Sequence, residues 1–173
     1  MTKEELVSQL YNSKNTFILG LASLALLADP DAQNLLKEKS ADLSGYSVSF
    51  GQVADLLGSA CDRQVALEEF AKSVLRRFVK EGHELVTHYC KGEGLSSDLC
   101  AQPWWQFSRL VRNALSHDFS FRLNDKDLKL LPVSWQGKTI DPSVDGQPLM
   151  LSFFGYADAW RLFLEYESFM FGL

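Results

Sequence analysis

Apolar side chains recur at steps of three and four residues through three long segments of the chain, 62–89, 103–117 and 155–171. This spacing gathers the apolar side chains on one side of an α-helix, so it predicts a mainly helical fold. The length of 173 residues is enough for one domain with a sizeable core. We therefore expect a single all-α domain, residues 1–173, built as an up-and-down helical bundle.

The N-terminal third predicts one long helix and several short elements. Thr2 and Glu5 have the spacing of a capping box, which predicts that the first helix spans about 3–28. Residues 40–49 are rich in serine and predict a loop between two short helices. Gly82 falls in the middle of the long helix over 62–89 and predicts a kink there.

Helical spacing stops after residue 118, and strand signals follow. Two apolar runs flank Gln136-Gly137, a sequence that favours a tight hairpin turn. Asp145-Gly146 predicts a second turn, and 149–153 predicts a third strand. These signals place a small β-hairpin or meander insert at about 129–153, before the C-terminal helix. The inner face of that helix is predicted to carry the following residues: Tyr156, Trp160, Phe163, Leu164 and Phe171.

The most apolar run, 17–28, is too short for a membrane span, which needs about 20 residues. The preceding residues lack the basic leader of a secretory signal, so we expect a helix buried on several sides, with no membrane partner. Three cysteines without paired spacing favour reduced thiols in a cytoplasmic protein.

A zinc site can be considered only at His83, His88, Cys90 and Cys100. The two histidines lie five residues apart, which separates them by about 140° around a helix. A close cysteine pair, which structural zinc sites commonly use, is also missing from the sequence. We therefore expect neither a metal nor another cofactor.

Charge is unevenly distributed along this chain of net charge −5. Residues 61–122 carry a slight excess of basic side chains, while the regions on both sides are acidic. Within 61–122, Lys72, Arg76 and Lys80 recur every four residues beside Arg77, flanked by glutamates. This pattern has two interpretations: a solvated helix face with helical ion pairs, or a track for phosphates that includes Arg76 and Lys80.

The helix predicted over 103–117 has an unusual polar face. Its apolar side chains fall within about 80° of Phe107, and the opposite side contains no carboxylate. Arginine offers a permanent planar cation, asparagine orients oxygen atoms, and histidine exchanges a proton near neutral pH. This side therefore combines groups that suit phosphate chemistry, and it is formed by Arg109, Arg112, Asn113, Ser116 and His117.

Arg112, Asn113 and His117 resemble the signature of the HEPN superfamily (higher eukaryotes and prokaryotes nucleotide-binding), in which four to six residues separate an arginine from a histidine. The position of the motif, late in a helical chain, fits the resemblance, whereas the β insert departs from the simplest members. The resemblance implies a metal-independent endoribonuclease that acts on RNA. It assigns His117 as the acid or base, Arg112 as the phosphate clamp and Asn113 as the orienting group, with Arg109 and Ser116 beside them for substrate binding.

Members of this superfamily typically place the motif helices of two subunits face to face, so the resemblance also implies a homodimer with a shared cleft. Similar proteins often act as toxins of toxin–antitoxin pairs or in antiphage defence, which implies a cognate antitoxin or regulatory protein. Two alternatives remain open at this point. The chain can be a non-catalytic module that binds a protein or nucleotide through the same groove, or a structural dimer held by its aromatic C-terminal helix.

Overall fold

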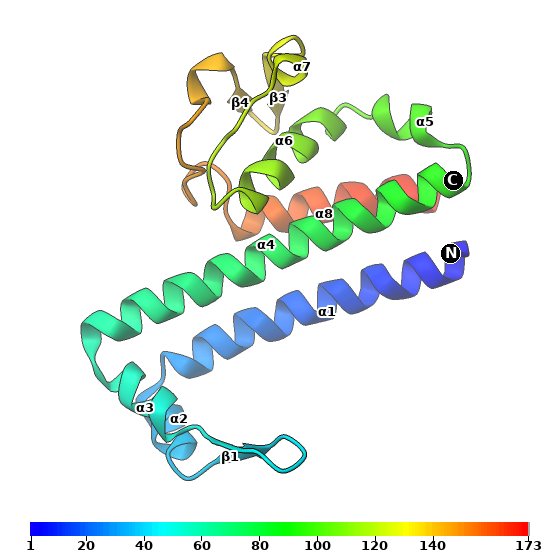
Figure 1. Cartoon of the computed structure of the whole chain (residues 1–173). Coiled ribbons are helices and arrows are strands. Elements are labelled where there is room, and N and C mark those ends of the chain that lie inside the picture. The colour runs from blue at the N-terminus through cyan, green and yellow to red at the C-terminus, as the bar shows by residue number, and fades with distance from the viewer. Residues whose placement is uncertain (173) are drawn as a thin grey trace. The chain divides into compact units, whose positions relative to one another are not determined.

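The computed structural model describes residues 1–172, and Figure 1 shows its helices and strands. About 66% of the chain is helical and 8% is strand, so the predicted all-α class with a small β component is confirmed. The elements in order are α1 (Lys3–Leu27), α2 (Pro30–Leu36), β1 (Ser40–Asp42), β2 (Ser47–Ser49), α3 (Gly51–Gly58), α4 (Ala60–Gly92), α5 (Ser96–Cys100), α6 (Trp105–Ser116), α7 (Asp125–Leu128), β3 (Val133–Trp135), β4 (Lys138–Ile140), the 3-10 helix η1 (Pro142–Val144) and α8 (Tyr156–Gly172).

Contacts along the chain define two compact units, each described here by itself. The first contains Met1–Lys14 and the chain from Leu75 onward, and the second contains Asn15–Val74. The single domain predicted from the sequence stays a prediction, since compact units of one chain can still fold together. No helix within residues 1–172 is long and apolar enough to cross a membrane.

Aromatic rings from α4 and α8 form the centre of the first unit. Phe78 of α4 stacks on Phe163 of α8, with ring centroids 4.3 Å apart. Gly82, one turn further along α4, allows this close approach because a Cβ there would lie only 2.9 Å from the Phe163 ring and 3.0 Å from Tyr166. Gly82 therefore has a packing role inside a helix that is continuous from Ala60 to Gly92, and the kink predicted there stays a prediction.

The inner face of α8 is rotated from the face predicted. Phe163 is buried, as expected, but Leu164 is 44% exposed and Phe171 is 65% exposed. The buried face instead includes Tyr166 and Met170, because α8 packs against both α4 and α6. Phe163 is consequently enclosed by its own chain, which removes it from any dimer surface built on the aromatic helix.

The insert contains the expected hairpin but lacks the expected third strand. β3 and β4 pair antiparallel around Gln136-Gly137, both at positive φ as a tight turn requires. Residues 149–153 contain no strand, and 151–153 form a turn. Their neighbour Pro148 makes a bridge with Ser120 instead, and the Leu149 amide donates to the Phe119 carbonyl at 2.6 Å. The chain that follows α6 is thus pinned to the chain that precedes α8.

The second unit holds a second antiparallel hairpin, β1–β2, where the sequence predicted only a loop over 40–49. Its strands are only three residues long and mostly exposed. The alternation of Tyr46, Val48 and Phe50 with serines was a strand signal that the serine-rich composition obscured. The prediction of a helix buried on several sides over 17–28 was also wrong, since Leu19 is 67% and Leu26 is 62% exposed.

Candidate functional site

Helix α6 carries the motif, and its orientation follows from its apolar face. All six apolar side chains predicted to share this face are buried: Trp104, Phe107, Leu110, Val111, Ala114 and Leu115. Burial of this stripe in the first unit fixes the helix and turns the remaining side outward. The polar side chains are accordingly half-buried at Arg109, Arg112 and Asn113, and exposed at Ser116 and His117.

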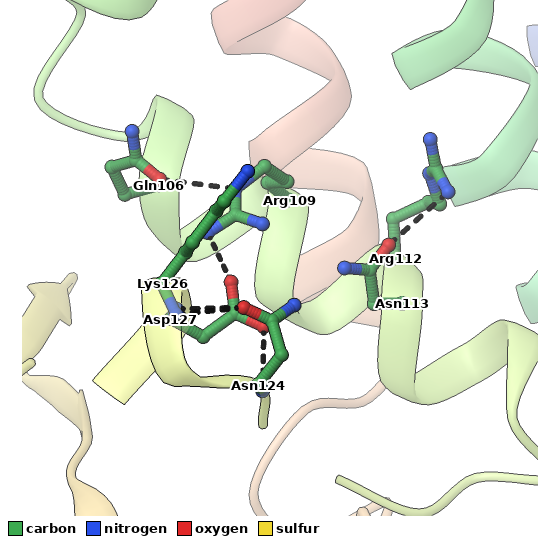
Figure 2. Close-up of polar contacts among 7 residues, drawn as sticks. All are labelled: Gln106, Arg109, Arg112, Asn113, Asn124, Lys126 and Asp127. Carbon is green, nitrogen blue, oxygen red and sulfur yellow. Dashed lines mark hydrogen bonds and ion pairs between the residues drawn. The ribbon is translucent and has the colours of Figure 1, made fainter. Parts of the chain in front are cut away.

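Arg109 is held by the insert. Its guanidinium donates to Asp127 Oδ1 at 2.6 Å and, through Nε, to Gln106 Oε1 at 3.1 Å. Asp127 is buried and also closes a capping box with Asn124 at the start of α7. Figure 2 shows Arg109 pointing to this carboxylate. An arginine bound this firmly anchors α7 to α6, so the structure gives Arg109 a structural contact where the sequence indicated only substrate binding.

Arg112 lies one turn further along the same polar face of α6, and its side chain points away from Asp127 (Figure 2). Its guanidinium makes one hydrogen bond, from Nη1 to Asn113 Oδ1 at 3.1 Å. None of the ion pairs among residues 1–172 includes Arg112, and its buried Nε has no acceptor. Burying a cationic N–H donor without a partner is unfavourable, so this side chain is prepared to receive an anion.

His117 ends α6 and leaves the helical conformation, with φ −104° and ψ 54°. Its ring is exposed, and its backbone N–H donates to the carbonyls of Asn113 and Ala114. Asp118 and Phe119 follow with φ of 53° and 55°, a left-handed conformation that residues with a Cβ seldom adopt. This turn departs from an ideal helix, in which Arg112 and His117 would diverge by about 140°. Ser116 donates its hydroxyl to the Arg112 carbonyl at 2.9 Å.

A buried polar chain connects α4, α6 and α8 beside Arg112. His83 Nδ1 lies 3.2 Å from Ser108 Oγ, which lies 2.5 Å from the Tyr166 hydroxyl, and the His83 ring stacks on Trp105. Burial, with the nearby charges of Arg112 and Arg109, lowers the pKa of His83 to about 3, so its ring is neutral at pH 7. Burial raises the pKa of Tyr166, which keeps the phenol neutral.

From the sequence, His83 was a candidate only for a zinc site, and its contacts with Ser108 and Trp105 were not predicted. The available signal was its position on α4, seven residues after Arg76 and therefore within about 20° of it around the helix. Among residues 1–172, no three His, Cys, Asp or Glu side chains gather in a way that could hold a metal ion.

The basic residues of α4 divide into two groups. Lys72, Arg77 and Lys80 pair with glutamates on the same helix, which is the solvated face that one interpretation predicted. Lys80 is half exposed and its ion pair with Glu84 is long, at 4.0 Å. Arg76 differs, because its guanidinium lies over the Phe119 ring, 5.3 Å from the centroid, and its buried Nε has no acceptor within residues 1–172.

No protein-family model matches this chain, and comparisons with curated proteins and with solved structures also found no significant match. Function is therefore argued from the arrangement around α6 alone.

Proposed function

We propose that this protein is a metal-independent endoribonuclease of the HEPN type. The observation that carries the proposal is the environment of Arg112, a partly buried guanidinium with an unpaired Nε, one hydrogen bond to Asn113 and no ion pair within residues 1–172. An unpaired cation of this kind suits a phosphate oxygen, and an exposed imidazole, His117, follows at the end of the same helix.

The proposed reaction is attack of a ribose 2′-hydroxyl on the adjacent phosphate. The O2′–P bond forms while the P–O5′ bond breaks, giving a 2′,3′-cyclic phosphate and a 5′-hydroxyl. His117 accepts the 2′ proton as the general base, and a general acid returns a proton to O5′. Arg112 stabilises the negative charge that gathers on the phosphoryl oxygens, while Asn113 orients the phosphate and the guanidinium.

The proposal includes a homodimer in which two α6 helices face one shared cleft. One exposed imidazole per motif supplies either the base or the acid, and a second subunit would supply the other. We also propose that a cognate antitoxin or another regulatory protein covers the cleft. The protein would then serve in a toxin–antitoxin or defence system.

Cleavage of single-stranded RNA in the presence of EDTA tests this function. The wild-type protein should yield fragments with cyclic phosphate ends, and His117→Ala should slow cleavage by at least a hundredfold because general acid–base catalysis contributes about that much or more. The melting temperature of His117→Ala should stay close to that of the wild type, since the ring is exposed. Sedimentation equilibrium of the same samples tests the dimer.

Equal cleavage by wild type and His117→Ala would remove His117 from the chemistry and point to a contaminating nuclease. Absence of cleavage by a folded, dimeric wild type would instead favour the non-catalytic binding module.

A further inference from the structure

Two buried polar atoms lack a partner in the part of the chain that the structure describes. Within residues 1–172, the buried side-chain nitrogen and oxygen atoms without a hydrogen bond are the Nε of Arg76 and the Nε of Arg112. Neither arginine takes part in an ion pair among those residues. Buried donors are nearly always satisfied in folded proteins, so both cations lack an acceptor that a ligand can supply.

The two arginines belong to the facing sides of α4 and α6. On α4, His83 follows Arg76 by seven residues, which places the two side chains within about 20° of each other around the helix. On α6, Arg112 follows Ser108 by four residues, or about 40° around the helix. His83 Nδ1 lies 3.2 Å from Ser108 Oγ, so this contact identifies the sides on which the two helices meet.

The two arginines also lie at nearly the same height along the helix pair. Arg76 contacts Phe119, which follows the end of α6, whereas the contact of His83 lies nearer the start of α6. The two helices therefore run antiparallel. Measured from the His83 contact, Arg76 lies about 10 Å along α4 and Arg112 about 6 Å along α6, in the same direction. The two positions differ by about 4.5 Å, which is less than one helical turn.

Two cations this close together favour a bound anion. Burial, and then the charge of Arg112, lowers the pKa of His83 to about 3, so this guanidinium acts directly on α4. Like charges repel each other, and the repulsion is stronger in a partly buried position than in bulk water. An anion bound by both guanidiniums would offset this repulsion and stabilise the folded chain.

Both guanidiniums are positioned by contacts that leave donors free. Arg76 lies over the Phe119 ring, 5.3 Å from the centroid, and this contact uses the face of the guanidinium rather than its N–H groups. Arg112 uses Nη1 for Asn113 Oδ1. Both arginines are half-buried, and within residues 1–172 their unbonded terminal nitrogens are not among the buried atoms, so a ligand can reach them from solvent.

The arrangement of the donors fits a phosphate group better than a carboxylate. The two oxygens of a carboxylate lie in one plane and match the fork of a single guanidinium. The free oxygens of a phosphate group point in different directions, so guanidiniums from two helices can each bind one.

We infer that Arg76 and Arg112 bind one phosphate group jointly, each guanidinium donating to a different oxygen. The inference rests on the proposed function in taking the scissile phosphate of RNA as the natural ligand. It makes Arg76 a second binding residue for that phosphate, supplied by α4 of the same chain that supplies Arg112.

Titration of inorganic phosphate into the full chain, at constant ionic strength, tests the joint site. The Nε–Hε signals of the arginines in NMR spectra report binding, and single substitutions assign them. Arg109 is the internal control, because its guanidinium already donates to Gln106 and Asp127. Arg76→Met removes the charge and keeps an apolar side chain on the ring beneath it, and its melting temperature reports whether it is folded.

The signals of Arg76 and Arg112 should shift together and give one dissociation constant, while the signal of Arg109 stays in place. Arg76→Met should weaken phosphate binding about tenfold, as expected for loss of one charge-assisted contact, and Arg76→Lys should restore part of the affinity. Arg77→Ala is the matched variant and should bind as the wild type does, because Arg77 is exposed and paired on its own helix. Acetate should bind roughly tenfold more weakly than phosphate.

A shift of only one of the two signals, two different dissociation constants, or no binding of phosphate by the folded wild type would overturn the joint site. Equal phosphate affinities of wild type and Arg76→Met would do the same, and equal binding of acetate would overturn the phosphate assignment. The wild-type titration decides the question even where Arg76→Met does not fold.

These results are distinguishable from failure of the ribonuclease proposal. Joint binding of phosphate without any cleavage of RNA removes the enzyme and leaves the site. Cleavage of RNA at equal rates by wild type and Arg76→Met removes Arg76 from the scissile phosphate and leaves the enzyme.

Discussion

Two arginines on the polar face of α6 have opposite surroundings. Arg109 donates to buried Asp127 and to Gln106, and it fastens α7 to the helix. Arg112, one turn further on, donates only to its neighbour Asn113 among residues 1–172, and its buried Nε has no acceptor there. The two arginines are three residues apart and look equivalent in the sequence. The comparison teaches that the partner, rather than the residue type, separates a structural cation from one that is available to a ligand.

Removing the ion pair between Arg109 and Asp127 should have the largest effect on the free energy of unfolding. Asp127→Ala leaves Arg109 partly buried without its carboxylate and removes the capping box of α7. We expect the free energy of unfolding to fall by about 3 kcal/mol, measured by urea denaturation. A loss below about 1 kcal/mol would show that the ion pair contributes little. The contrast between Arg109 and Arg112 would then be weaker than the geometry indicates.

Lowering the pH should reduce the free energy of unfolding, because the buried ring of His83 stays neutral in the folded chain. The pKa of His83 is about 3 in the folded chain and about 6.5 when unfolded, so below pH 6.5 the unfolded state binds more protons. The contribution to stability is therefore complete above pH 6.5 and is lost as the pH falls toward 3, at about 1.4 kcal/mol per pH unit, or roughly 2–3 kcal/mol at pH 4.5.

Urea denaturation of wild type and His83→Gln between pH 7.5 and 4.5 measures this loss. Carboxylates titrate in both proteins, so the difference between the two curves isolates the ring. Parallel curves would mean that His83 is readily protonated in the folded chain, and that burial and the nearby arginine charges lower its pKa far less than described.

Replacing Arg112 should have the smallest effect on stability. Arg112→Met removes an orphaned donor and keeps an apolar stem, so the free energy of unfolding should change by less than about 1 kcal/mol, with a gain more consistent than a loss. Arg109→Met is the matched control and should cost more, since it leaves Asp127 buried and unpaired. If both variants lose the same stability, Arg112 has a structural partner comparable to that of Arg109.

Local patterns were sufficient for α6 and for the hairpin turn. The apolar spacing from Trp104 to Leu115 predicted the buried face because a helical period depends only on neighbouring residues. Gln136-Gly137 predicted its turn because both positions need positive φ. By contrast, residues 149–153 are apolar enough for a strand, but none of the strands paired within residues 1–172 includes them. Their absence from a sheet depends on tertiary structure that the sequence pattern does not encode.

The candidate site was predictable only in part. Arg112, Asn113 and His117 were found because they are close in the sequence. The ion pair of Arg109 joins residues 18 apart, and the chain from His83 through Ser108 to Tyr166 joins three helices. Neither the ion pair nor the chain of polar contacts produces a periodic pattern in the sequence. Arg76 could be grouped with Lys72 and Lys80 by spacing alone, and only its contact with Phe119 distinguishes it from those paired side chains.

The backbone pairing of Ser120 with Pro148 brings the two ends of the intervening segment to one point. The turn Gln136-Gly137 within this segment is exposed and can therefore accept a foreign peptide while Ser120 and Pro148 stay paired. Insertions or deletions between Ser120 and Pro148 would likewise change which molecules can reach α6, while the helices stay unchanged.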